Sequence, residues 1–209
     1  MKIARRKRTF FEYSKDAGLS LMEVLIAVVI IATIALAAAG LSVNGIQTAT
    51  TQQRQQVAVT IANGAMETVS GWSVDNLYDG RYSNKVTTAF SNNSTKPGVA
   101  QTYAVSDTSA TSASTAAIPI TATAPQNGTS YTTTTLIGAC YEPVGGGNCG
   151  VIAGQATPPA TVPAGYTKLT RIIVLVSWTA GSKCAVSGCY YETTTLADPH
   201  DDLQWVTHS

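Results

Sequence analysis

One carboxylate in the sequence lies where its charge needs an explanation. From Leu19 to Val43 the chain reads LSLMEVLIAVVIIATIALAAAGLSV, in which Glu23 is the only charged residue. A charged side chain at the centre of a membrane helix costs about 2.5–3.5 kcal/mol on insertion scales, and less near the helix end. A cation that pairs with Glu23 is the simplest reason for its presence.

A new amino terminus is one source of such a cation. If the peptide bond after Gly18 is cut, Leu19 gains an α-amine, which is positive at neutral pH because its unperturbed pKa is about 8. The amine is too near along its own helix to pair well with Glu23, but a neighbouring subunit displaced along a fibre presents one. Breaking such a buried pair costs roughly 3–5 kcal/mol, so the pair would fix the axial register of an assembly.

The apolar stretch is long enough to cross a membrane. As a helix it spans roughly 37 Å, against about 30 Å for a hydrocarbon core. Residues 1–18 carry six basic and two acidic side chains, a net of +4, which leaves −3 for the rest of a chain whose total is +1. The positive-inside rule therefore predicts a cytoplasmic N-terminus and a C-terminal part outside the membrane.

Residues 17–31, AGLSLMEVLIAVVII, resemble the cleavage and methylation site of type IV prepilins and pseudopilins. The resemblance implies that a basic leader ends at Gly18 and that a prepilin peptidase cuts after it. Leu19 would then be the N-methylated first residue, and Glu23 the glutamate of the fifth mature position. It also implies other pilin or pseudopilin subunits, assembly platform proteins and the membrane as partners, and a filament in the periplasm or outside the cell.

Two positions depart from the family pattern. The first mature residue is usually Phe, and here it is Leu19. Major pilins often carry a proline near the middle of this helix, whereas here Gly40 is expected to act as a softer break.

Two other interpretations compete with this resemblance. An ordinary signal peptide would have its apolar core at Val24–Leu36 and be cut after Ala39, which would release a secreted binding or adhesive domain starting at Gly40. A plain single-pass anchor is the other alternative. Neither interpretation gives Glu23 a role.

The helix is expected to continue beyond the membrane segment (residues 19–43) as residues 44–72. An apolar stripe at three- and four-residue spacing predicts that one face of this part packs on a sheet. The stripe comprises Ala58, Ile61, Ala62, Ala65, Met66, Val69 and Trp72. Gly64 within it costs about 1 kcal/mol relative to alanine, which the close approach of a strand would justify. Gly71 is predicted to end the helix.

Residues 73–209 are expected to form an extracellular head rich in strands and loops. Residues 75–98 predict a connection with little regular structure, and strands are expected at 131–136, 168–178 and 190–196. The strand at 168–178 is apolar on both faces, which predicts a central position. A long helix followed by such strands resembles minor pilins. The predicted fold is therefore α+β, with a long N-terminal helix, transmembrane in its first half, packed by its second half on a small antiparallel sheet.

Four cysteines lie in the last third of the chain as two close pairs, Cys140 with Cys149 and Cys184 with Cys189. An even number in an exported chain favours disulfides over zinc, whose ligands are usually two to four residues apart. Three connectivities remain open, and the local one needs the smallest loops. Its stabilisation would be modest, because even a loop of about 15 residues is worth roughly 3 kcal/mol.

No pattern predicts an enzyme or a nucleic-acid site. No phosphate-binding glycine loop follows a strand, no nucleophile elbow is visible, and a net charge of +1 does not attract nucleic acid. The cluster Asp198, His200, Asp201 and Asp202 has oxygen ligands that suit calcium, which some pseudopilins bind in this region, but a solvated acidic turn is favoured. The sequence thus predicts a structural subunit of a type IV pilus or a related secretion or competence filament, without cofactor or metal.

Overall fold

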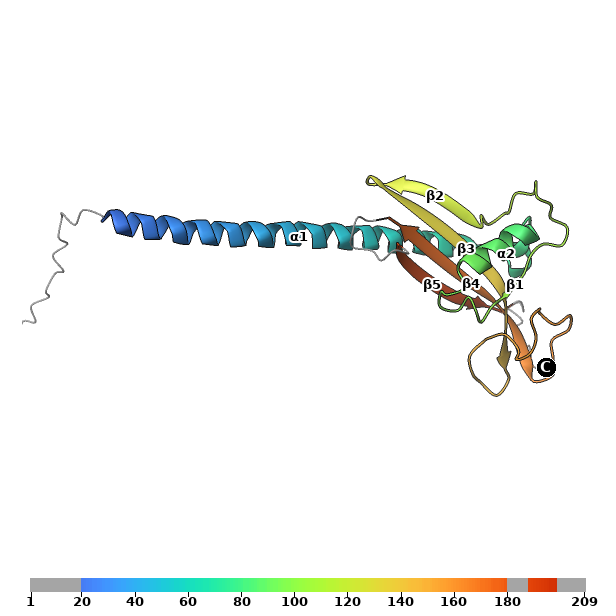
Figure 1. The fold of residues 1–209 in the computed structure, drawn as a ribbon. Helices are drawn as coiled ribbons and strands as arrows, with labels where there is room; N and C mark the ends of the chain where they lie inside the picture. The colour runs from blue at the N-terminus through green and yellow to red at the C-terminus, as the bar shows by residue number, and fades with distance from the viewer. Residues whose placement is uncertain (1–19, 180–187, 199–209) are drawn as a thin grey trace, which may run out of the picture. The chain divides into compact units, whose positions relative to one another are not determined.

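A computed structural model describes residues 20–179 and 188–198 of the chain. The chain divides into two compact units, Met1–Ala49 and Thr50–Ser209. The elements, shown in Figure 1, are α1 (Leu21–Ser70), the 3-10 helix η1 (Val74–Tyr78), α2 (Ser83–Asn92), β1 (Tyr103–Ala104), β2 (Thr121–Gln126), β3 (Thr129–Pro143), β4 (Tyr166–Trp178) and β5 (Cys189–Ala197).

The long N-terminal helix predicted from the sequence is confirmed as α1. Its backbone remains helical through Gly40, so the break expected there is absent. The helix ends at Ser70, and the Gly71 N–H donates to the Glu67 carbonyl oxygen at 3.1 Å. The lack of proline leaves the helix uninterrupted over its whole length.

The strands form one antiparallel sheet that is built around β3. On one side β3 pairs with β4, and on the other it pairs with β1 and β2. β5 pairs with the free side of β4. The predicted central strand is thereby confirmed as β4, in which Ile173 lies between Leu136 of β3 and Thr194 of β5.

The second half of α1 packs on one face of this sheet, as the apolar stripe predicted. Ala58, Ala62 and Val69 are buried against strand residues that include Val174. Two expectations were wrong. Trp72 lies beyond the end of α1 and is 42% exposed. No strand approaches Gly64, because a Cβ added there would meet no atom within 4 Å among the described residues.

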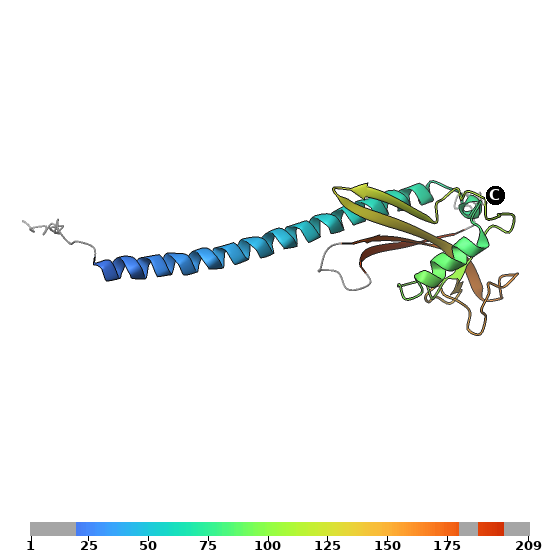
Figure 2. The same cartoon turned by 45° about the horizontal axis from the view of Figure 1, so that its top comes forward.

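The opposite face of the sheet is covered by α2, which Figure 2 shows in green against the strands. Val86 and Phe90 of α2 pack with Ile173 and Leu175 of β4 in a second apolar cluster. Alternate residues of β4 therefore contribute to different clusters, as the pattern of this strand predicted.

The segment 75–98 was predicted to have little regular structure, and this prediction was wrong. It contains most of η1 and all of α2. The α2 sequence, SNKVTTAFSN, is poor in strong helix formers, so its own propensity is weak. This helix is stabilised by the burial of Val86, Ala89 and Phe90 on the sheet and not by its intrinsic helix propensity.

β3 is much longer than the strand predicted at 131–136: it starts at Thr129 after a hairpin turn, and at its other end it continues to Pro143 in pairing with β4. Asn127 and Gly128 connect β2 to β3 and both have positive φ, 49° and 72°. Asn-Gly is the preferred pair for a two-residue hairpin turn of this kind. The dipeptide was visible in the sequence and was a missed signal for β2.

Arg171 of β4 joins the sheet to two loops. Its Nη1 donates to the Gly98 carbonyl oxygen and to Thr102 Oγ1, each at 3.1 Å, and its Nη2 donates to the Cys149 carbonyl oxygen. Cys149 in turn forms a disulfide with Cys140 of β3, with 5.4 Å between the Cα atoms. Burial lowers the pKa of Arg171, and backbone and hydroxyl oxygens supply its partners. The cross-link and the guanidinium together hold this loop on the sheet.

Glu192 of β5 is a carboxylate in a poorly solvated position. Its Oε2 is buried and has no hydrogen-bond partner among the described residues. Burial raises the pKa of Glu192, while the charge of Lys96 acts in the opposite direction. The Lys96 Nζ lies 3.4 Å from the centre of the Tyr190 ring, an attractive cation–π contact.

Glu192→Gln is expected to raise the thermal midpoint at pH 7 and to have no such effect in acid. A raised pKa means that the folded state binds the proton more tightly than the unfolded state. Stability is therefore lost as pH rises from the ordinary carboxyl pKa through the raised one, and it stays lower at neutral pH. The midpoints of the detergent-solubilised full chain at pH 7 and about pH 3.5 test this. Exposed Glu67→Gln is the control, and an equal shift at both pH values would contradict the prediction.

Candidate functional site

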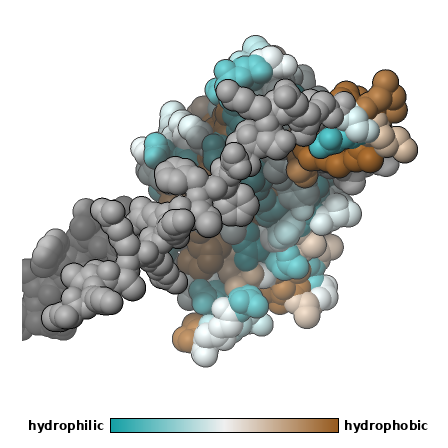
Figure 3. Space-filling view, turned by 90° about the vertical axis from the view of Figure 1, so that its left-hand side faces the viewer, coloured by the Kyte–Doolittle hydropathy of each residue, from teal (hydrophilic) through white to brown (hydrophobic). Residues whose placement is uncertain are grey.

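The first half of α1 presents an apolar surface that no other described residue covers. Every residue from 20 to 50 is exposed, including Leu25, Ile30 and Ile34. Among the described residues, α1 is the one helix long and apolar enough to cross a membrane. In the space-filling view of Figure 3, brown hydrophobic side chains form separate groups among teal and white ones. Because soluble monomers rarely expose continuous apolar areas of this size, lipid or neighbouring helices are the natural surroundings of residues 21–46.

The polar groups of this segment are suited to apolar surroundings. Thr33 Oγ1 donates to the Ile30 carbonyl oxygen at 2.8 Å, and Ser42 Oγ donates to the Ala38 carbonyl oxygen at 2.9 Å. Each hydroxyl thus satisfies its donor within its own helix and needs no water for it. Glu23 is the only charged side chain between Ser20 and Gln53.

Ser20 and Glu23 together shape the start of α1. Ser20 Oγ accepts a hydrogen bond from the Met22 N–H at 3.3 Å, and the Ser20 carbonyl oxygen accepts one from the Glu23 N–H at 2.9 Å. Ser20 therefore occupies the N-cap position. Glu23 lies three residues later, at the spacing of the Ser-x-x-Glu capping box, but its carboxylate makes no capping hydrogen bond among the described residues. Sequence reasoning missed this local role, although the spacing was visible.

The Glu23 carboxylate remains open to a partner. Within residues 20–179 and 188–198, no hydrogen bond or ion pair involves its oxygens. It lies in the first turn of α1, where the positive end of the helix dipole favours an anion. This position lowers the cost of the charge, but it does not supply a full counter-charge.

The other predicted site residues are distributed as follows. Gly18, Leu19 and Cys184 lie outside the described residues, so cleavage, methylation and the Cys184–Cys189 pairing stay predictions. Of the candidate calcium cluster only Asp198 is described, and the described residues contain no group of three or more metal-ligating side chains. Cys140 and Cys149 have the local pairing, far along the chain from Glu23.

Comparison with known proteins identifies the N-terminal segment. Residues 13–39 match the family profile described as prokaryotic N-terminal methylation motif, the motif of type IV prepilins. No curated protein and no solved structure shows a significant match to the chain. The match covers Gly18, Leu19 and Glu23 and continues into the exposed apolar part of α1.

The motif and the fold together support a type IV pilin-like or pseudopilin-like protein. The motif implies processing by a prepilin peptidase and assembly with other pilin subunits, and with the apolar helix it indicates membrane anchoring. It characterises structural subunits and not a family of enzymes.

Proposed function

We propose that this chain is a minor pilin or pseudopilin of a type IV pilus or a related secretion or competence filament. Its precursor is held in the membrane with residues 1–18 in the cytoplasm. A prepilin peptidase removes these residues, and Leu19 becomes the methylated amino terminus. The processed subunit joins a helical filament through residues 19–43, and assembly platform proteins assist this step.

The observation that carries the proposal is the continuity of the motif with an uncovered apolar helix. The methylation motif at residues 13–39 runs into α1, whose side chains from Leu21 to Ile46 are all exposed. In lipid, close packing is what favours association of a helix of this kind with similar helices, because lipid is as apolar as the helix surface. Outside lipid, burial of the apolar area is worth roughly 25 cal/mol per Å² and keeps such a bundle together.

Glu23 provides the specificity of this association. Two purely apolar helices can pack side by side at many axial offsets, because the contacts between them are similar at each offset. An ion pair between the Glu23 carboxylate and the α-amine of a neighbouring subunit's Leu19 forms at one offset only. Any other offset leaves two unpaired charges in apolar surroundings, at several kcal/mol.

The head suits a low-abundance position in the filament. Long loops connect its strands, such as residues 144–165 between β3 and β4, and the charged fraction of the whole chain is only 12%. Loops of this length are typical of binding or specialised contacts more than of a repeated shaft lattice.

N-terminal mass spectrometry of the processed protein is expected to find Leu19 as the first residue, with one methyl group on its amine. The measurement uses protein from cells with and without their prepilin peptidase, and the peptidase-negative cells should retain residues 1–18. A mature terminus at Gly40 would instead identify an ordinary signal peptide and overturn the proposal. An intact bond between Gly18 and Leu19 in the exported protein would do the same.

A further inference from the structure

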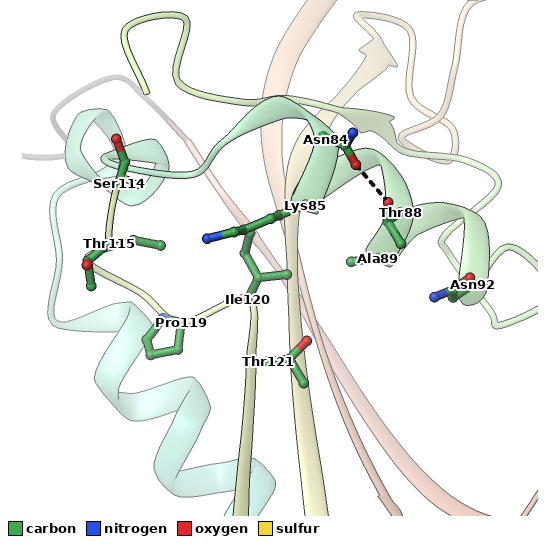
Figure 4. Close-up of a pocket in the computed structure, with 12 residues that line it drawn as sticks. Asn84, Lys85, Thr88, Ala89, Asn92, Ser114, Thr115, Pro119, Ile120 and Thr121 are labelled. Carbon is green, nitrogen blue, oxygen red and sulfur yellow. Dashed lines mark hydrogen bonds between the residues drawn. The ribbon is translucent and has the colours of Figure 1, made fainter. Parts of the chain in front are cut away.

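The head contains an open pocket of about 540 Å³ between α2 and the segment that leads into β2. Figure 4 shows α2 on one side of it and residues 114–121 on the other. Asn84, Thr88 and Asn92 come from one row along α2, at a spacing of four residues. Ser114, Thr115 and Thr121 line it from the other segment. The volume lies in the range of small-ligand pockets.

The charge of this pocket is positive. Lys85 is the only charged residue among those that line it, and its side chain extends across the opening toward Thr115 (Figure 4). Lys85 also lies in the first turn of α2, which has neither an acidic residue nor a side-chain cap. A cation at that position is disfavoured by the helix dipole. An anion bound in the pocket would offset this cost.

A second cation lies behind the wall of the pocket. Arg81 is completely buried, and its Nη1 and Nη2 donate to the carbonyl oxygens of Ile118 and Thr135 at 3.0 and 2.7 Å. The Arg81 Nε has no hydrogen-bond partner among the described residues. Burial lowers the pKa of the Arg81 guanidinium to about 10. Gly80, next to Arg81, and Pro119, next to Ile118, both line the pocket.

Two acidic residues adjoin this wall without lining the pocket: Asp79, whose carbonyl oxygen accepts a hydrogen bond from the Ala117 N–H at 3.0 Å, and Asp107. The Asp107 carboxylate accepts hydrogen bonds from the Gly80 N–H at 3.0 Å and from Ser109 Oγ at 2.6 Å. It is not part of the lining. The polar surface of the pocket therefore combines hydroxyl and amide groups with a positive charge.

The apolar part of the lining favours a ring over a compact inorganic anion. Ala89, Pro119 and Ile120 contribute carbon surface beside the polar row of α2. A sugar ring presents both an apolar C–H face and hydroxyl groups, which donate to and accept from amides and hydroxyls. A sugar that also carries a carboxylate matches the whole set of groups in this pocket.

We infer that this pocket binds a uronic acid residue of an acidic polysaccharide. Lys85 pairs with the carboxylate, the hydroxyl and amide side chains of α2 and residues 114–121 bind the sugar hydroxyls, and Pro119 and Ile120 pack on the ring. The inference concerns the head alone and holds whichever way the N-terminus is processed.

Calorimetric titration of the detergent-solubilised full chain with trigalacturonate tests this inference. We expect binding at least about tenfold tighter than for the methyl ester of the same trisaccharide, which lacks the charge. Lys85→Met should remove that preference, Lys85→Arg should keep most of it, and exposed Lys168→Met is the matched control. Thr88→Trp, which fills the pocket without a change of charge, should abolish binding of both ligands.

Four results would overturn the inference. Equal affinity for trigalacturonate and its methyl ester would exclude recognition of the carboxylate. Unchanged affinity in both Lys85→Met and Thr88→Trp would place any binding elsewhere on the protein. Equal or tighter binding of an acetylated triglutamate peptide would show that the pocket recognises acidic peptide and not sugar. No binding of trigalacturonate by the wild-type chain would also refute it.

Discussion

Glu23→Ala is expected to leave cleavage after Gly18 intact and to reduce incorporation into filaments about a hundredfold or more. Within the proposed assembly, the variant leaves the α-amine of a neighbouring Leu19 without its counter-charge in apolar surroundings. An unpaired buried charge costs roughly 3–5 kcal/mol, and each 1.4 kcal/mol corresponds to a factor of ten. The ratio of filament-bound to membrane-bound protein in fractionated cells measures the effect.

Glu23→Gln separates the charge of Glu23 from the effect of a side chain of its shape at the start of α1. Glutamine serves in a capping box as glutamate does, so the helix start around Ser20 is retained. Glutamine has no charge, so the pair with the α-amine is lost. We therefore expect Glu23→Gln to fail in assembly nearly as completely as Glu23→Ala.

The outcome for glutamine decides between charge pairing and helix capping. Incorporation of Glu23→Gln at the wild-type level would show that assembly does not need the charge of Glu23, and it would overturn charge pairing. Glu67→Ala is the matched control, since it removes a carboxylate from an exposed position on the same helix. That variant should assemble normally.

Gly138→Ala is expected to destabilise the head by about 3 kcal/mol, because overpacking a tight site typically costs 1–3 kcal/mol and sometimes more. Gly138 lies in β3 opposite Ala104 of β1. A Cβ there would collide with the Tyr103 carbonyl oxygen, and it would lie 2.6 Å from Thr102 Cγ2 and 3.1 Å from Phe90 Cζ. The backbone oxygen belongs to the β1–β3 pairing, so it does not move aside cheaply.

The thermal midpoint of the detergent-solubilised chain measures this effect. A loss of about 3 kcal/mol should lower the midpoint by roughly 6–12 °C in a chain of this size. Gly145→Ala is the control, because a Cβ at Gly145 meets no atom within 4 Å in the part of the chain that the structure describes. Equal midpoints for the two variants would contradict the close packing of β1 and α2 against β3.

Much of the fold could be predicted from local sequence patterns, because the interactions that cause those elements are local. The length of α1 follows from an uninterrupted stretch without proline, and the position of β4 follows from apolar side chains on both of its faces. The Asn127-Gly128 turn was equally readable, because positive φ at both residues favours that dipeptide. Its omission hid β2, although the necessary signal was in the sequence.

The errors lie where burial outweighs local preference. α2 has weak helix propensity and depends on the apolar surface of the sheet, so the sequence 83–92 looked like loop. A close contact was predicted at Gly64, which has no neighbour within 4 Å of an added Cβ among the described residues, whereas Gly138, for which no contact was predicted, is tightly enclosed. A glycine in a sequence does not show what surrounds it.

The sequence by itself identified the N-terminal segment, because a single charge within an apolar run can be recognised without knowing which distant residues lie beside it. The sequence also determined the class of fold, since periodicity follows from the backbone geometry of helix and strand. Only the tertiary structure decided the positions of Arg81 and Arg171. Arginine side chains are usually exposed, and these two are buried because loops distant along the chain supply carbonyl oxygens to them. The pocket around Lys85 also depends on contacts between distant parts of the chain, because its two walls meet only after the chain has folded.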